Sequence, residues 1–393
     1  MQNHFFWVFD HLRGVFIDFF SFSLIGDGAS AGVALTNLMR TLGMLVSGIW
    51  TINRVMTTMS SVERIKEYVE FDDHEAEWEV PEEDSKTGEK WPTEGTIEIS
   101  NLKVRYRDGL PLVLRGLNMK IEANQKVGIV GRTGSGKSTL MLALMRILER
   151  PEEEEHQESF IKIDGVDIYR LGLHKLRKML VIIPQDPFLM EGTLRSNLDP
   201  TGSYTSQELI DGLQTVEFFS TVKENQILSL KEKTEKIRNK SQPKIDQTPQ
   251  KIEKESEENV LSSLTDDQKL LFTIEKSGSN LSLGQRQLVC IARALVNRPK
   301  ILLMDEATAS VDQKTDEIIQ RVIMEEMTKT TILTIAHRIN TVIGYDKIVV
   351  LDHGRKIEEG SPRELMESGG AFSGMVDDCG PSFRSEMLNY LSN

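Results

Sequence analysis

A glycine-rich loop follows a short apolar run and precedes a helical pattern, which is an arrangement that binds phosphate groups. The apolar run covers 125–130 and the helical pattern covers 140–147. Glycines let backbone N–H groups turn inward around phosphate oxygens, and the positive end of the following helix adds attraction. We therefore expect nucleotide phosphates to bind the loop residues Gly131, Arg132, Thr133, Gly134, Ser135, Gly136, Lys137, Ser138 and Thr139.

Two side chains of this loop have further chemistry. Lys137 places a mobile positive charge on the phosphates, and Ser138 offers a hydroxyl ligand to Mg²⁺. We predict Lys137 as a catalytic residue as well as a binding residue, and Ser138 as a metal ligand.

Two carboxylates, Asp305 and Glu306, follow a second apolar run at 300–304. A buried parallel strand delivers such acids to the carboxyl edge of a sheet, where ligands bind. We expect Asp305 to hold Mg²⁺, directly or through water. We expect Glu306 to orient and polarise an attacking water.

Two more apolar runs end in polar side chains that suit the same edge. The run 180–184 ends at Gln185, and the run 330–336 ends at His337. Gln185 is available to Mg²⁺ or to the water, and we count it among both the metal ligands and the nucleotide-binding residues. His337 is placed to hydrogen-bond the γ-phosphate, so it joins Lys137 and Glu306 as a predicted catalytic residue.

Strands and helices alternate from about Gly95 onward, which indicates an α/β domain that holds these residues in place. The chain has 393 residues and a net charge of −13. It therefore lacks the basic face that a nucleic acid requires, and we expect no nucleic-acid partner. Two cysteines, Cys290 and Cys379, cannot build a disulfide framework or a cysteine metal cluster.

Two apolar stretches lie at the front of the chain. The stretch 29–52 contains one charge, Arg40, and is long enough to cross a bilayer. Arg54 follows it, which favours a cytosolic position for that end. The stretch 5–25 carries Asp10, Arg13 and Asp18; it either spans with its polar side facing a bundle interior or lies as an amphipathic helix on protein or membrane.

The sequence divides into four parts by composition. Residues 1–60 are predicted as a partial transmembrane domain of two helices, in contact with the lipid membrane. Because two helices cannot enclose a translocation path, we expect either a fragment of a longer protein or a chain with membrane partners. The next part is a linker (61–94). It is followed by a nucleotide-binding domain (95–374), with a disordered insertion at about 225–265, and by a tail (375–393).

Further motifs match a known family. The run 280–287, Asn-Leu-Ser-Leu-Gly-Gln-Arg-Gln, resembles the signature motif of ABC ATPases, and Gln285 lies 20 residues before Asp305 as in that family. Ser310-Val-Asp312 resembles the loop that contacts the opposing subunit. Tyr106 matches the aromatic residue that stacks on adenine.

Within the ABC transporters, the chain is similar to the second nucleotide-binding domain of subfamily C, the multidrug-resistance-associated group. The similarity extends from about Phe5 to Ser373, apart from the insertion. The front end is then similar to the last two transmembrane helices of that group's second membrane domain. The resemblance is carried by the runs 126–134, 182–187, 196–200 and 333–338.

The resemblance implies an ABC-type P-loop ATPase fold of the α/β class, with a mixed sheet core, a small antiparallel sheet and a helical subdomain. It implies ATP and Mg²⁺ as cofactors. Two such domains, on the same or another chain, close head to tail with two ATP molecules between them, and closure moves the membrane helices. Ser282, Gly284 and Gln285 then contact the ATP of the partner domain.

One residue departs from the usual signature, Leu-Ser-Gly-Gly-Gln, because Leu283 replaces its first glycine. A side chain there crowds the approach to the partner's γ-phosphate and fits a weakly hydrolytic site across the interface. ATP-driven export of a solute by an integral membrane protein with a cytosolic ATPase domain is the function that the sequence favours. The alternatives are an ATP-gated regulatory or channel subunit, and a truncated copy that does not assemble.

Overall fold

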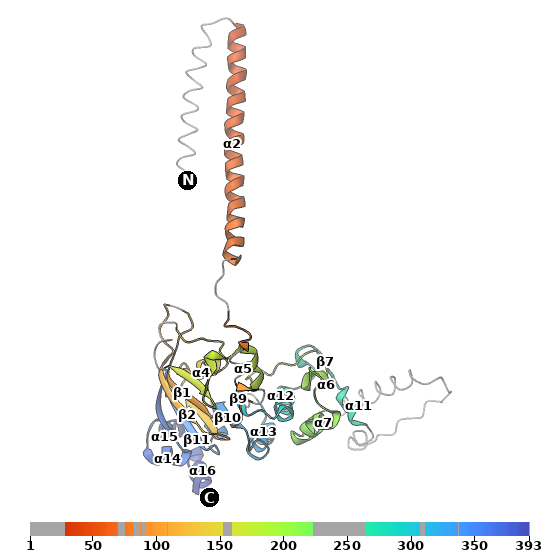
Figure 1. Ribbon diagram of the computed structural model, residues 1–393, viewed down its shortest axis with the longest axis vertical. Coiled ribbons are helices and arrows are strands. Elements are labelled where there is room, and N and C mark those ends of the chain that lie inside the picture. Colours follow the sequence, from red (N-terminus) through yellow and green to blue (C-terminus); the bar gives the residue numbers. More distant parts are fainter. Residues whose placement is uncertain are drawn as a thin grey trace, which may run out of the picture. The chain divides into compact units, whose positions relative to one another are not determined.

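The computed structural model describes residues 28–69, 75–81, 87–88, 91–107, 109–151, 159–222, 264–306, 311–336 and 338–392 (Figure 1). Contacts divide the chain into two compact units, 1–74 and 75–393, which we describe separately. The predicted helix 5–25, His337 and nearly all of the predicted insertion lie outside the described residues.

The described part of the first unit is one helix, α2 (Gly28–Val69). It is long and apolar enough to cross a membrane by length and composition. It continues past residue 60, so the charged segment that follows Ser61 belongs to the same helix. Its large apolar side chains, such as Trp50 at 72% exposure, are not buried within the unit.

Threonine hydroxyls of α2 are satisfied inside the helix. The hydroxyls of Thr36, Thr41 and Thr51 each donate a hydrogen bond of 2.8 Å to the carbonyl four residues earlier. This pattern leaves fewer unpaired donors on the helix surface, which is what a lipid environment demands.

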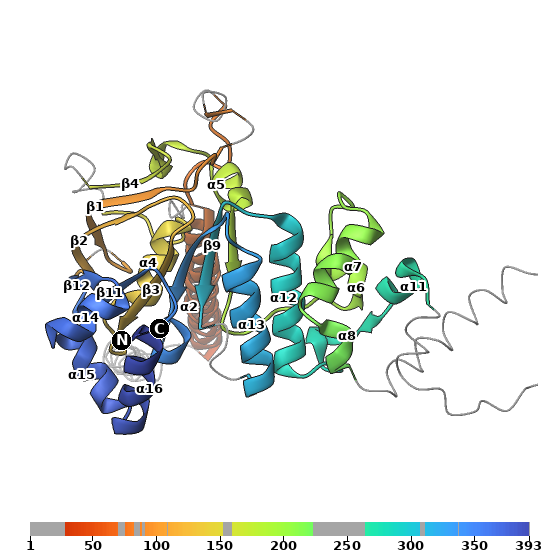
Figure 2. The same ribbon diagram turned by 90° about the horizontal axis from the view of Figure 1, so that it is seen from below.

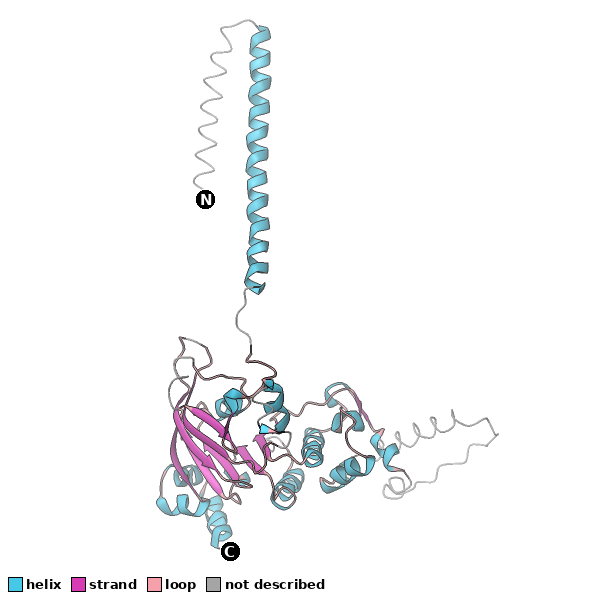
Figure 3. Ribbon diagram, viewed as in Figure 1, coloured by secondary structure: helices cyan, strands magenta, loops and turns pink. Residues whose placement is uncertain are grey.

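The second unit is built around a six-stranded mixed sheet, seen in Figure 3. Five neighbouring strands run parallel, and the sixth pairs antiparallel at one edge. In spatial order the strands are β12 (Arg355–Gly360), β11 (Lys347–Asp352), β3 (Lys126–Gly131), β10 (Thr331–Ile335), β9 (Ile301–Asp305) and β6 (Leu180–Ile183).

Two smaller sheets accompany it, and both are antiparallel. One has the order β2 (Leu114–Ile121), β1 (Ile97–Val104), β4 (Phe160–Ile163) and β5 (Val166–Asp167). The other pairs β7 (Gly192–Thr193) with β8 (Thr273–Ile274). The mixed sheet and the small antiparallel sheet agree with the fold expected from the sequence.

The helices fall into three groups (Figure 2). One group lies by the antiparallel sheet and the linker: α4 (Lys137–Leu144), the short 3₁₀ helix η2 (Ile168–Arg170) and α5 (Leu173–Met179). A helical region on the opposite side holds α6 (Leu194–Leu198), α7 (Ser206–Thr215), α8 (Phe218–Thr221), α11 (Asp266–Leu270) and α12 (Leu283–Asn297), with α13 (Gln313–Glu325) beside it. The carboxyl-terminal group is α14 (Pro362–Ser368), α15 (Ala371–Asp378) and α16 (Pro381–Ser392).

The mixed sheet is buried on both faces, because its strands supply side chains to two separate hydrophobic cores. Leu303 of β9 packs with the antiparallel sheet and α4, whereas Leu302 and Met304 pack with the helical region. Continuous apolar strands are typical of parallel sheets that are covered on both sides. This double cover holds the strand ends in a fixed arrangement.

The entry to β1 is held by one carboxylate, that of Asp164 in the turn between β4 and β5. It accepts backbone hydrogen bonds from Thr93 at 2.7 Å, Glu94 at 2.9 Å, Gly95 at 2.9 Å and Thr96 at 2.7 Å. Burial by itself raises the pKa of Asp164, but these N–H donors outweigh it and the pKa lies below 3.8.

We predict that Asp164→Ala lowers the free energy of unfolding by about 2 kcal/mol at neutral pH, because several backbone donors lose a charged acceptor. Since the pKa is lower in the folded than in the unfolded chain, this stabilisation is present above pH 3.8 and is lost as the pH falls through the folded pKa. Urea unfolding of the full chain in detergent, followed by circular dichroism, measures it. Asp352→Ala, at an exposed carboxylate, is the control; equal midpoints for the two variants at neutral pH would contradict the prediction.

Candidate functional site

The strand order brings the predicted phosphate and metal ligands that follow strands to one edge of the mixed sheet. The phosphate loop leaves the carboxyl end of β3, Glu306 follows β9, and Gln185 follows β6. Strand β10 lies between β3 and β9, and its carboxyl end leads to the predicted position of His337. Because these strands are parallel, their carboxyl ends share an edge, as the sequence analysis expected.

The phosphate loop turns sharply into α4. Gly136 is the residue before the helix and has a φ of 100°, a left-handed conformation that favours glycine. The Lys137 ammonium folds back over the loop and donates to the carbonyls of Gly131 at 2.8 Å and Arg132 at 3.2 Å. These two carbonyl contacts hold the side chain at the mouth of the loop.

The charge of Lys137 is tuned by its surroundings. The residue is 4% exposed, and burial lowers its pKa, while the carboxylates of Glu306 and Asp305 partly oppose that shift. The attraction between the Lys137 ammonium and these two carboxylates links the phosphate loop to the end of β9. A buried ammonium with so few water contacts is suited to a phosphate anion as its partner.

The loop also contains a buried polar atom that suits a phosphate ligand. Ser135 is 2% exposed, and its hydroxyl has no hydrogen-bond partner within the described part of the chain. Buried polar groups are normally paired, because an unpaired one carries a desolvation penalty. A phosphate oxygen in the loop would supply that partner, so the residues present fit a nucleotide.

The acid after β9 is held in place by two contacts. Glu306 has a φ of 45°, and its backbone N–H donates to the carbonyl of Ile335 at 3.1 Å. Its carboxylate accepts a hydrogen bond from Gln185 Nε2 at 3.1 Å. The sequence predicted both residues at this edge but did not predict that they would bind one another.

The proposed metal ligands share the same edge. Ser138 is exposed in the first turn of α4, Asp305 ends β9, and Gln185 follows the neighbouring strand β6. A hydroxyl, a carboxylate and an amide oxygen are all oxygen donors, which is the ligand type that Mg²⁺ prefers. These residues would suit Mg²⁺ beside a phosphate, and their role as its ligands stays a prediction.

Tyr106 lies next to the phosphate-loop helix. Its hydroxyl is 3.3 Å from the Thr139 hydroxyl, and the side chain is 50% exposed. The exposed part of the aromatic side chain is available to stack on a base, while the hydroxyl anchors the residue to α4. Its predicted contact with adenine is compatible with this position.

The signature residues lie at the start of α12 in the helical region (Figure 2). Ser282 and Gln285 form a reciprocal cap: Ser282 Oγ accepts from Gln285 N at 3.2 Å, and Gln285 Oε1 accepts from Ser282 N at 2.9 Å. Gln285 Nε2 also donates to Thr221 O at 2.5 Å. Within this chain, then, the amide of Gln285 fixes the helix start, and its predicted contact with a nucleotide stays a prediction.

Gly284 meets the segment that follows the β9 acids. A Cβ at this position would lie 3.2 Å from the Thr315 hydroxyl and 3.4 Å from Val311 Cγ1. Asp312, of the predicted subunit-contact loop, caps α13 by accepting from Thr315 N at 3.1 Å. The signature helix and the start of α13 are therefore packed closely together.

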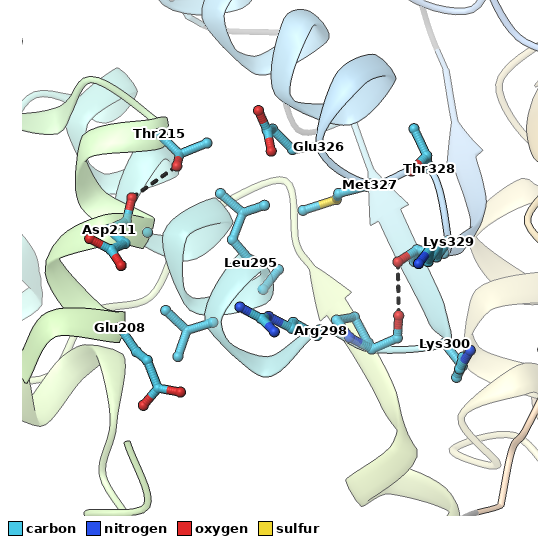
Figure 4. A pocket seen from close by; sticks show the side chains of 15 residues that line it. Glu208, Asp211, Thr215, Leu295, Arg298, Lys300, Glu326, Met327, Thr328 and Lys329 are labelled. Carbon is cyan, nitrogen blue, oxygen red and sulfur yellow. Dashed lines mark hydrogen bonds between the residues drawn. The ribbon is translucent and has the colours of Figure 1, made fainter. Parts of the chain in front are cut away.

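A cavity of about 590 Å³ lies at the opposite edge of the mixed sheet (Figure 4). Its lining includes Lys300 and Thr330, which directly precede β9 and β10, so it is remote from the carboxyl ends of those strands. Figure 4 shows Glu208 and Asp211 on the α7 side and Lys300 and Lys329 on the strand side. No sequence motif indicates this cavity, because its walls come from separate segments of the chain.

Comparisons with known proteins agree with the motifs. Residues 114–309 match the family model described as ABC transporter. ATP-binding cassette sub-family C member 3 of Rattus norvegicus is 39% identical over 363 residues, which is 91% of this chain and 21% of that protein. Bile pigment transporter 1 of Saccharomyces cerevisiae is 45% identical over 335 residues, 85% of this chain and 19% of that protein. The chain thus spans about a fifth of the length of these relatives.

A solved structure shares the fold. The structure of a bacterial Atm1-family ABC exporter with ATP bound has a TM-score of 0.61 and 26% sequence identity, and covers 90% of this chain and 52% of that chain. The predicted fold class and the predicted resemblance to subfamily C are therefore confirmed.

We predict that Gly136→Ala raises the dissociation constant for ATP by about tenfold, since a left-handed backbone costs a non-glycine residue about 1–2 kcal/mol. The added Cβ would also lie 2.8 Å from Leu114 Cδ2. Isothermal titration calorimetry measures the change. The matched control is Gly202→Ala, which has a φ of 71° and open space around its Cβ position; an equal affinity loss in both variants would refute a local effect on the loop.

Proposed function

Because this chain belongs to the ABC transporter family and its nucleotide-binding domain is related to subfamily C, we propose that the domain binds ATP and hydrolyses it to drive export of a solute across a membrane. The observation that carries the proposal is the shared sheet edge, where Lys137, Gln185 and Glu306 converge. The nucleotide-binding assignment itself follows from the family.

The phosphates of ATP replace the loop carbonyls as the partners of Lys137. The ammonium is already in the loop and needs only to exchange two neutral acceptors for an anion, which is the stronger interaction. The backbone N–H groups of the loop and the start of α4 hold the same phosphates. Ser138, Asp305 and Gln185 would hold Mg²⁺ beside these phosphates, and the ion would supply positive charge opposite the phosphate oxygens.

Glu306 orients the attacking water. Its backbone N–H is bound to β10, and its carboxylate accepts a hydrogen bond from Gln185, so two contacts place it at the sheet edge. A carboxylate that is placed before reaction avoids the cost of reorganisation during it. His337 stays the predicted γ-phosphate ligand.

The active unit is a pair of nucleotide-binding domains closed head to tail, on the same or another chain. Ser282, Gly284 and Gln285 reach the ATP held by the partner's phosphate loop. The membrane helices, among them α2, convert closure into transport, with the ATPase domain in the cytosol. An exporter of the bacterial Atm1 family shares this fold, which supports the transport direction proposed here.

We predict that Glu306→Gln lowers kcat for ATP hydrolysis by about 100-fold or more, because a positioned general base contributes that much, and leaves ATP affinity within a few-fold. Phosphate release by the full chain, paired with a first nucleotide-binding domain of a subfamily C transporter, measures it. Glu326→Gln, an exposed acid beyond α13, is the matched control. Unchanged turnover in Glu306→Gln would exclude the proposed catalytic role; ATP binding without turnover in the unaltered pair would favour a regulatory subunit.

We predict that Leu283→Gly raises ATPase activity at the partner's site by up to about tenfold, or about 1.4 kcal/mol of barrier, because the half-buried side chain would no longer crowd the approach of the signature backbone to the partner's γ-phosphate. The same phosphate assay applies, with the partner's phosphate loop intact and Lys137→Ala in this chain to silence the other site. The variant Leu283→Ala removes the bulk of the side chain without adding the backbone freedom of glycine, so it separates these two effects. No increase in either variant would dismiss the crowding explanation.

A further inference from the structure

The segment that joins α2 to the ATPase domain docks on α5. The backbone N–H of Leu173 donates to Glu77 O at 3.1 Å, and that of His174 donates to Trp78 O at 3.0 Å. The first N–H groups of a helix have no partner within it, and Gly172 offers no side-chain cap. The linker backbone therefore caps this helix.

Side chains reinforce the contact. The Trp78 ring stacks on His174, with centroids 5.4 Å apart and planes 9° from parallel. Arg177 binds Glu75 through two parallel hydrogen bonds of 2.9 Å each. The hydrogen bond from Arg177 lowers the pKa of Glu75, so the carboxylate is charged at neutral pH.

The same guanidinium also reaches the end of the phosphate-loop helix. Arg177 Nε donates to Met145 O at 3.2 Å, and one of its terminal nitrogens donates to Arg146 O at 3.0 Å. Met145 caps the carboxyl end of α4, whose first residue is Lys137. The last carbonyls of a helix need such external donors.

Arg146, just after α4, forms a second set of hydrogen bonds between α4 and the start of α5. Arg146 donates from one terminal nitrogen to Ile168 O at 3.0 Å and to Leu171 O at 2.7 Å, just before α5 begins. Arg146 is buried, so water does not compete for these bonds. The two helices are thus joined in both directions by arginine side chains.

Helix α5 leads directly into the catalytic edge. It ends at Met179, β6 begins at the next residue, and Gln185 follows that strand and binds Glu306. On the other side, only residues 70–74 separate the end of α2 from the docked segment. Arg177 therefore stands where the membrane linker, the phosphate-loop helix and the strand that leads to Gln185 meet.

We propose that Arg177 is a positioning residue that couples the linker, through Glu75, to nucleotide binding in the phosphate loop. This rests on the proposed ATP-binding function and adds a route for its regulation. A passive tether would need only the two backbone hydrogen bonds to α5. The guanidinium instead ties the linker to the far end of an eight-residue helix, and a helix this short moves as a rigid body with Lys137 at its other end.

The test is to measure nucleotide affinity and linker protection together in Glu75→Gln. This exposed substitution removes the charged partner of Arg177 and spares the bonds of Arg177 to α4. We expect about a fivefold weaker affinity for the non-hydrolysable analogue AMP-PNP. Because coupling is reciprocal, AMP-PNP should slow hydrogen exchange of the Leu173 and His174 amides by a similar factor in the unaltered chain and not in the variant.

The matched control is Glu77→Gln, an exposed acid in the same segment whose side chain forms no ion pair among the described residues. It should bind AMP-PNP like the unaltered full chain. The coupling role is overturned if the unaltered chain binds AMP-PNP without any change in hydrogen exchange of the Leu173 and His174 amides. It is also overturned if Glu75→Gln and Glu77→Gln bind AMP-PNP with equal affinity. Either result leaves the proposed function standing. Failure of the unaltered chain to bind AMP-PNP overturns both.

Discussion

The parallel pairing of β3, β10, β9 and β6 is the constraint on which the site depends. It carries the phosphate loop, the acids after β9 and Gln185 to one edge, although these segments are far apart along the chain. Two hydrophobic cores, one on each face of the sheet, hold each strand in register. A slip of one residue would turn each apolar side chain toward the wrong face. The hydrogen bond between Gln185 and Glu306 is a direct result of that alignment.

The backbone groups at helix ends lack hydrogen-bond partners within the helix, and segments distant in sequence supply those partners. Arg177 and Arg146 satisfy carbonyls at the ends of α4 and η2, and the linker backbone satisfies donors at the start of α5. Asp164 does the same for the strand entry at residues 93–96. Each contact gives a hydrogen-bond partner to a polar group that would otherwise lack one, and it also fixes one element relative to another. These contacts fix α4, α5 and the linker segment 75–81 relative to one another.

The signature region has a different character. Ser282 and Gln285 cap their own helix, and Gly284 packs against the start of α13, so local contacts define the shape of this surface before any partner arrives. Leu283, half-buried at the first position of α12, is the position where the sequence departs from the family pattern. A surface that is already ordered loses less entropy when it associates with another surface.

The phosphate-binding loop and the carboxylates after β9 could be predicted from the sequence alone, because each is a contiguous motif whose residue types indicate the ligands that suit it. The fold class could also be predicted, since alternating apolar runs and the family motifs are local signals. Three contacts could be found only from the folded chain: Gln185 binds Glu306, the Gln285 amide donates to the Thr221 carbonyl, and Arg177 joins Glu75 to the end of α4. Those contacts depend on strand order and helix packing, and a lone arginine or glutamine in a sequence carries no mark of the distant carbonyl or carboxylate that it will meet.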